Sequence, residues 1–194
     1  RTMNVTMTDI KKLREMTGAG LSDCKKALAE SDDMDGAVAY LRKKGQAVAA
    51  KRSDREAAEG CVLVKVADGF GAIIALKCET DFVANNADFV ALTQQILDAA
   101  VANKCKSLEE VNALPMGDGT VADAVTARSG ITGEKMELDG YSYIEGDNIC
   151  TYNHMNRNGL CAMVAFNAPV EAEVGKNVAM QVASAAPVAI DETG

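Results

Sequence analysis

The sequence predicts an α+β protein, in which a small helical module precedes a core of antiparallel sheets with packed helices. Apolar side chains recur at helical spacing in the first 45 residues, and after residue 60 short β-like runs joined by Asx-Gly turns alternate with helical stripes. The charge changes at the same place. Twelve Lys and Arg stand against eight Asp and Glu through Arg55, a net charge of +4, and eight stand against twenty beyond it, a net charge of −12. This change indicates a domain boundary.

Residues 1–45 are expected to form a three-helix N-terminal domain. Asp9 can cap the first helix, which stops at Gly18-Ala19-Gly20. The second helix follows directly, and the third is introduced by Asp32-Asp33 and ends at Gly45. About 45 residues enclose only a small core, so we expect an accessory module. The apolar stripes are Ile10, Leu13 and Thr17, then Leu21, Cys24 and Leu28, then Met34, Val38 and Leu41.

The first half of the core begins after a polar segment, 46–59, which is a linker or a helical tail. Strands are expected over 60–66 and 71–78. They flank Asp68-Gly69, a strong hairpin signal because the turn needs residues that tolerate positive φ. A helix over 88–101 carries an apolar stripe that would lie on the sheet.

The second half of the core, 141–194, repeats the order of strand, Asx-Gly turn, apolar strand and helix found in the first half, 60–140. Asn158-Gly159 stands where Asp68-Gly69 stands, so we expect two related halves. We expect the second half to be incomplete, because a lone hairpin and helix leave a sheet edge uncovered. The remaining elements are helices over 107–114 and 121–128 around a loop at 115–120, strands over 141–144, 148–152 and 159–166, and a helix over 170–185.

The composition disfavours several classes of protein. No apolar run approaches the ~20 residues that cross a bilayer, and residues 1–7 lack the apolar stretch of a secretory signal, so we expect a cytoplasmic protein that binds no membrane. A net charge of −8 disfavours direct nucleic-acid binding. Six cysteines form no CxxC pair and fall in expected helices and strands. A disulfide framework is an alternative, but reduced packing residues explain them better.

Residues suited to bond-making chemistry are scarce. His154 is the only histidine, and no further metal ligand joins Cys150, His154 and Cys161 at a conventional spacing. No GxSxG nucleophile motif is present. The stretch 17–23 differs from a dinucleotide fingerprint, because no strand precedes it and Asp23 occupies the place of the third glycine. We therefore expect no cofactor, no bound metal and no enzyme, but a protein that acts by binding.

Phe82 needs either a core or a partner. It follows the apolar run 72–76 and precedes the helix at 88–101, so it lies on a strand-to-helix turn. Turns are usually polar and exposed, and the chain has no Trp and only four Phe. Phe82 either packs beneath its own helix or faces a partner. Its solvent exposure separates the two.

Two long stretches resemble the signatures of a known family. Residues 12–20 with 23–28, and residues 78–85, are similar to the signature stretches of the elongation factor Ts family, the nucleotide exchange factors of the GTPase elongation factor Tu. The resemblance covers essentially the whole chain in order. It implies an N-terminal domain similar to ubiquitin-associated domains, an α+β core with antiparallel sheets, and elongation factor Tu as the partner. Further agreement comes at 132–135, at His154 and at 179–183.

The resemblance also implies which residues contact the GTPase. In the family, the loop that Thr80, Asp81, Phe82 and Val83 match enters the GTPase near its magnesium and P-loop, with the aromatic side chain wedged between helices. Phe82 would be the wedge of a loop that dislodges magnesium. Shorter family members dimerise, so a homodimer is a further expectation. The other positions that match partner contacts are Leu13, Gly18, Lys25, Arg52, Thr132, Gly133 and His154.

Three functions compete at this point. The first is a guanine-nucleotide exchange factor. The second is an interaction adaptor, in which the helical module recognises a helix or a ubiquitin-like surface and the core is a scaffold; a Phe82 buried in its own core would favour it. The third is a small-molecule enzyme, which the near absence of histidine and of catalytic motifs disfavours. The resemblance favours the exchange factor.

Overall fold

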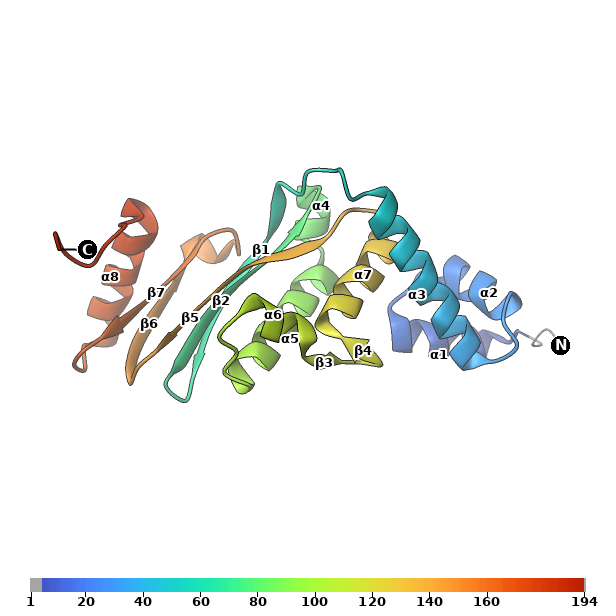
Figure 1. Ribbon diagram of the computed structural model, residues 1–194, viewed down its shortest axis with the longest axis horizontal. Coiled ribbons are helices and arrows are strands. Elements are labelled where there is room, and N and C mark those ends of the chain that lie inside the picture. The colour runs from blue at the N-terminus through green and yellow to red at the C-terminus, as the bar shows by residue number, and fades with distance from the viewer. Residues whose placement is uncertain (1–4, 194) are drawn as a thin grey trace.

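The computed structural model describes residues 5–193, so residues 1–4 of the expected N-terminal domain and residue 194 lie outside it. Its layers follow one another along the long axis of the molecule (Figure 1). A helical bundle at one end is followed by a layer of helices, a three-stranded sheet, a two-stranded sheet and the last helix. The predicted α+β class is confirmed. Within the described residues, no helix combines the length and the apolar character needed to cross a bilayer.

The N-terminal bundle consists of α1 (Met7–Thr17), α2 (Leu21–Ala29) and α3 (Met34–Lys51). The cap of α1 is Thr6 and not Asp9. The Thr6 hydroxyl accepts a hydrogen bond from the Asp9 backbone, and the Asp9 carboxylate accepts one from the Thr6 backbone, which is a capping box. The buried side chains of the bundle are Ile10, Leu13, Ala19, Cys24, Ala27, Leu28 and Ala37.

The predicted end of the third helix at Gly45 is wrong, because α3 continues to Lys51. Gly45 is buried where α3 crosses α7 (Val121–Thr132). A Cβ placed on Gly130 of α7 would lie 2.6 Å from the Gly45 Cα. Glycine therefore marks a close approach of two helix backbones here, not a helix end. The segment 46–59 begins as a helical tail.

The first sheet joins β1 (Glu59–Ala67), β2 (Phe70–Cys78) and β5 (Glu137–Glu145) in antiparallel pairs, with β2 in the centre. The predicted hairpin turn is confirmed, since Asp68 and Gly69 have φ of 50° and 72°. The expected division between residues 140 and 141 falls inside β5, which pairs with β2 on both sides of it. Local sequence patterns could not indicate this pairing between distant segments.

Helices cover one face of this sheet. They are α4 (Asp81–Ala84), α5 (Ala87–Ala102), α6 (Leu108–Ala113) and α7, and a small hairpin of β3 (Pro115–Met116) and β4 (Gly119–Thr120) replaces the expected loop before α7. Strand alternation sends every second side chain of β2 toward the helices. The largest buried side chains there are Phe70, Ile74, Leu76, Phe89, Ile96, Leu97, Val111 and Val121.

The second hairpin joins β6 (Asn148–Asn153) and β7 (Cys161–Phe166), and α8 (Ala172–Ala185) packs on it. The tight turn expected at Asn158-Gly159 is wrong. The connection is longer and contains a 3₁₀ helix, η1 (His154–Asn156), although Asn158 does have a positive φ of 55°.

This hairpin packs on the face of the first sheet that lies opposite the helices. A Cβ on Gly71 of β2 would lie 3.4 Å from side-chain atoms of both Ile149 and Met163. The edge strand β1 also meets the connection between β6 and β7, because the Val62 amide donates to the Asn158 carbonyl at 2.6 Å. The bond to Val62 brings the η1 connection toward the end of the sheet where α4 lies.

Candidate functional site

Phe82 lies on α4 and is 85% exposed. Thr80 caps the helix, because its hydroxyl accepts a hydrogen bond from the Val83 amide at 3.4 Å. Val83 packs against the core and Ala84 is buried, whereas Asp81 is exposed beside Phe82. The structure therefore excludes the interpretation in which Phe82 packs beneath its own helix. An aromatic ring in water on a short helix is available to a partner.

One carboxylate holds the base of this turn. Glu134 accepts hydrogen bonds from the backbone amides of Glu79 at 3.0 Å and Thr80 at 3.1 Å, both on Oε2, and from the Thr80 hydroxyl on Oε1 at 2.6 Å. We refer to these three bonds as the Glu134 clamp. Hydrogen bonds to an ionised acceptor are stronger than neutral ones, so the clamp fixes the start of α4.

Glu79 connects the same turn to the end of the N-terminal bundle. Its carboxylate lies 3.0 Å and 3.3 Å from Arg52 Nη1 and accepts the Lys135 amide at 2.7 Å. The Lys135 ammonium group donates to the Ser53 carbonyl at 3.0 Å. Arg52 caps α3, so the helix of the bundle is tied directly to the Phe82 turn. Arg52 was expected to contact a partner, and the structure gives it this internal contact.

The C-terminal end of α7 lies between the Phe82 turn and the α1–α2 turn. At the α1–α2 turn, Gly18 has φ of 69°, and a Cβ there would lie 3.7 Å from Arg128 Nη1 and Ile131 Cδ1. Gly133 ends α7 in the left-handed conformation with φ of 75° and faces open space. The Thr132 hydroxyl donates to the Arg128 carbonyl at 3.1 Å. Three segments singled out from the sequence therefore adjoin one another.

Arg128 joins this end of α7 to the start of α5. Its Nη2 lies 3.3 Å from Asn86 Oδ1, the cap of α5, and 3.4 Å from Asp88 Oδ2. The Arg128 side chain is only 11% exposed. It therefore fixes the segment that directly follows α4.

His154 lies in the connection between β6 and β7, which neighbours the C-terminal end of α4. It is exposed at the start of η1, and its Nδ1 lies 3.0 Å from the Tyr152 hydroxyl. The loop 156–159 and residues Ala84 and Asn85 line one shallow cleft, so α4 and the η1 connection are neighbours. In Figure 1 both lie on the upper side of the sheets. Sequence analysis missed Met155, which is 61% exposed in η1; no local pattern marks it.

Known proteins match the chain over almost all of its length. The model of the family Elongation factor TS matches residues 79–194. Elongation factor Ts of Bacteroides fragilis is 72% identical over 193 residues, which are 99% of the chain and 58% of the relative. Elongation factor Ts of Porphyromonas gingivalis is 56% identical over 190 residues, 97% of the chain and 69% of the relative. The chain belongs to the elongation factor Ts family. It spans 58% of the length of the Bacteroides relatives.

Two of the positions that match elongation factor Ts contacts lie on helices α1 and α2 themselves. Lys25 is exposed on α2. Leu13, in contrast, is completely buried in the bundle core. A direct contact of Leu13 with a partner is therefore corrected to a packing role, because a side chain with no exposed surface offers none to a second protein.

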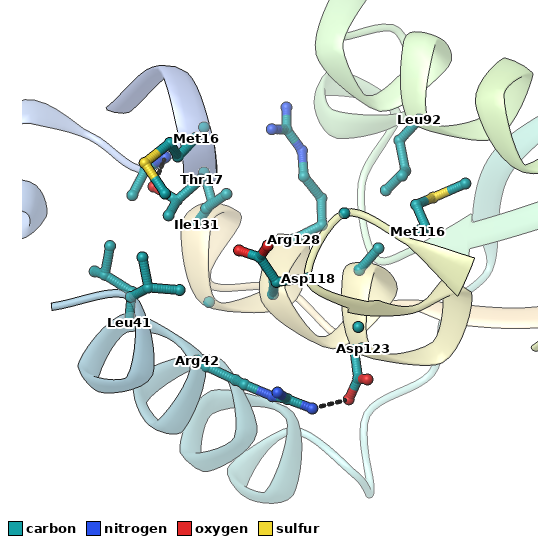
Figure 2. Close-up of a pocket in the computed structure, with 18 of the residues that line it drawn as sticks. Met16, Thr17, Leu41, Arg42, Leu92, Met116, Asp118, Asp123, Arg128 and Ile131 are labelled. Carbon is teal, nitrogen blue, oxygen red and sulfur yellow. Dashed lines mark hydrogen bonds and ion pairs between the residues drawn. The ribbon is translucent and has the colours of Figure 1, made fainter. Parts of the chain in front are cut away.

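A cleft of about 560 Å³ separates the N-terminal helices from α5 and α7 (Figure 2). An ion pair of 2.9 Å between Arg42 of α3 and Asp123 of α7 crosses one side of it. Its remaining lining mixes both charges with apolar side chains and favours no ligand class. The apolar members are Met16, Val38, Leu41, Leu92, Met116 and Ile131, together with small alanines.

Two of the cysteine thiols are poorly suited to nucleophilic chemistry. The cysteines are free, and burial raises the pKa of Cys78 and Cys161 to about 11 each, which keeps these thiols protonated and poorly nucleophilic near neutral pH. Within residues 5–193, no group of His, Cys, Asp and Glu side chains is arranged to hold a metal ion. The site consists of exposed side chains on a firmly held backbone.

Proposed function

We propose that the chain is a guanine-nucleotide exchange factor that binds the GTPase elongation factor Tu in the cytoplasm and promotes GDP release during translation elongation. Thr80 to Val83 enter the GTPase near its magnesium and phosphate site, with Phe82 as the wedge. The observation that carries the proposal is the 85% exposure of Phe82 on a turn held by the Glu134 clamp. A buried Phe82 would have favoured the adaptor alternative, and the exposure of Phe82 removes that support.

The mechanism is a linkage between two binding equilibria. A protein that binds nucleotide-free GTPase more tightly than the GDP form must, by reciprocity, weaken GDP binding by the same factor, and each tenfold shift is about 1.4 kcal/mol. Magnesium bridges the phosphate oxygens and the P-loop hydroxyl. A side chain that disturbs the magnesium site therefore lowers nucleotide affinity without touching the base.

The proposed partner surface extends from the α1–α2 turn to η1. We assign Gly18, Thr132 and Gly133 to its middle, Lys25 to the bundle side and His154 to the far side of Phe82. The partner is a protein and not a nucleic acid, in keeping with the net charge of −8. A homodimer stays a prediction, which sedimentation equilibrium of the purified chain tests.

The experiment is release of a fluorescent GDP from purified elongation factor Tu, with no addition, with the chain, and with its Phe82→Ala variant. The chain should accelerate release, and the variant should accelerate it at least about tenfold less, because buried aromatic anchors contribute about 2 kcal/mol or more. Val174→Ala is the matched control, since Val174 is 49% exposed on α8, at the opposite end from the bundle. Equal rates with and without the folded chain would contradict the proposed function.

A further inference from the structure

We propose that Glu134 is a positioning residue for Phe82, a role that rests on the proposed exchange function. It lies 54 residues from Thr80 in the sequence and contacts the turn only through the three bonds of the Glu134 clamp. None of these bonds involves the side chain of Phe82. Its effect on a partner passes through the conformation of the turn that carries Phe82.

The clamp determines which way the Thr80 hydroxyl points. A hydroxyl has one donor and two acceptor positions. The Thr80 hydroxyl donates its proton to Glu134 Oε1 at 2.6 Å, which leaves its lone pairs free to accept the Val83 amide. The carboxylate therefore orients the cap of α4, and the cap in turn orients the helix that carries Phe82.

α4 depends on such support because it has only four residues. A single helical turn is unfavourable on its own, since several dihedral angles are fixed for one hydrogen bond. Phe82 is 85% exposed and so packs little against the free protein, and only Val83 and Ala84 anchor the helix to the core. Without the clamp, we infer that the turn samples other conformations. Binding would then have to include the ordering of Phe82, which weakens it.

The end of α7 is built to deliver this carboxylate. Gly133 turns the chain through a left-handed conformation, and the Glu134 amide donates to the Thr132 hydroxyl at 3.3 Å. Thr132 and Gly133 were expected to contact a partner. The geometry points to a further task for both residues, which is to aim Glu134 at the Phe82 turn.

The test is a double-mutant cycle on GDP release from elongation factor Tu, with Glu134→Gln, Phe82→Ala and the double variant. Glutamine keeps the shape but turns an NH₂ group toward backbone or hydroxyl donors. We expect Glu134→Gln alone to reduce the acceleration about tenfold, and to cause no further loss in the Phe82→Ala background. Losses that multiply would overturn positioning through Phe82. Glu137→Gln, an exposed carboxylate three residues away, is the control and should match wild type.

Amide hydrogen exchange of the chain alone separates the two proposals. In Glu134→Gln the Glu79 and Thr80 amides should exchange at least about tenfold faster, while the Leu76 amide in the centre of the sheet keeps its protection. Unchanged exchange at Glu79 and Thr80 would overturn the clamp even if the wild-type chain accelerates GDP release. No acceleration by the wild-type chain would overturn the exchange function, and with it the role of Glu134 in that function. A loss of protection throughout the chain would show that Glu134→Gln is unfolded. In that case the double-mutant cycle on GDP release is repeated with Glu134→Asp in its place. If the losses from Glu134→Asp and Phe82→Ala multiply, the proposal is overturned.

Discussion

The α4 turn and the η1 connection both present an exposed apolar side chain, yet they are held in different ways. Phe82 lies on the turn held by the Glu134 clamp, and the Glu134 carboxylate that accepts these bonds follows α7 in the sequence. Met155 of η1 stands on a backbone in the left-handed region, with φ of 52°. The side-chain hydrogen bonds of the η1 connection are local, since Asn153 and Asn158 exchange bonds of 2.7 Å and 3.2 Å, and a backbone bond joins Asn158 to Val62 of β1.

This difference teaches that side-chain hydrogen bonds couple the Phe82 turn to α3 and to the end of α7, whereas the η1 connection is held to the first sheet by a backbone bond to β1. Through Glu79 and Glu134 it is tied to both α3 and α7, which meet at the Gly45–Gly130 crossing. Changes in α7 should therefore reach Phe82. The η1 connection should not respond to them, because its side chains bond locally and its bond to the first sheet is with β1, not with α3 or α7.

The largest expected effect comes from Gly130→Ala. The new Cβ would lie 2.6 Å from the Gly45 Cα, so the helices must separate, and we expect unfolding free energy to fall by up to about 3 kcal/mol. The Glu79 and Thr80 amides should exchange faster, while the amides of the η1 connection do not. Urea denaturation and hydrogen exchange measure these effects. Gly159→Ala is the control, because nothing lies within 4 Å of its Cβ position; equal destabilisation by both would contradict the account.

The second-largest expected effect is a loss of unfolding free energy at alkaline pH, which should differ between the two regions. Cys78 donates to the Thr80 carbonyl at the base of the Phe82 turn, and Cys161 donates to the Val62 carbonyl after η1. Burial raises the pKa of each thiol from 9.0 to about 11. The unfolded chain therefore loses these protons first, so the stabilisation is complete below pH 9 and is lost as the pH rises to about 11.

The fully buried Cys78 should account for about 2 kcal/mol of this loss, and the half-buried Cys161 for less. Urea midpoints at pH 8 and pH 10.5 for wild type, Cys78→Ala and Cys161→Ala measure the two contributions. The urea midpoint should depend less on pH in Cys78→Ala than in Cys161→Ala. An unchanged slope in Cys78→Ala would show that its thiol titrates normally.

Thr80→Val should have a smaller effect on stability but a clear one on function. The substitution keeps the shape and removes both the donor to Glu134 and the acceptor for Val83, so we expect a loss of about 1 to 2 kcal/mol. Acceleration of GDP release should fall about tenfold. The counterpart in the other region is Asn158→Gly, which loses the 2.7 Å bond from the Asn153 side chain but relieves a positive φ. It should change neither the unfolding free energy nor the acceleration of GDP release by much. A larger effect than that of Thr80→Val would contradict the difference between the two regions.

The smallest effect is expected for Met155→Ala. Its side chain is 61% exposed and offers a partner one flexible contact, so acceleration of GDP release should fall by only about twofold. Unfolding free energy should stay within about 0.5 kcal/mol of wild type. A loss as large as that of Phe82→Ala would make η1 an equal part of the site.

Local patterns in the sequence were sufficient for much of the fold. The Asp68-Gly69 turn and the apolar stripes of α1 and α5 depend on residues close together in the chain, and these were predicted correctly. In the predicted α2 stripe, Cys24 and Leu28 are buried but Leu21 is 48% exposed. Gly45 was misjudged because its reason is a tertiary contact with Gly130. The pairing of β5 with β2, and the long connection before β7, likewise depend on distant packing.

The candidate site shows the same limit. The sequence indicated that Phe82 lies on a turn and needs a core or a partner, and its exposure decides between them. It did not indicate that Glu134 holds Thr80 from 54 residues away, or that Arg52 faces Glu79. Helical spacing placed Leu13 on an apolar face, which is where the structure buries it, whereas the resemblance assigned it a partner contact.

The most direct test of the central claim is to measure the affinity of the chain and of Phe82→Ala for elongation factor Tu in its nucleotide-free and GDP-bound forms. If Phe82 is the wedge, wild type binds the nucleotide-free form far more tightly. The variant should lose at least about tenfold of that preference, mainly through weaker binding of the nucleotide-free form. Equal weakening toward both forms would contradict the account, because Phe82 would then contribute to binding without driving GDP release.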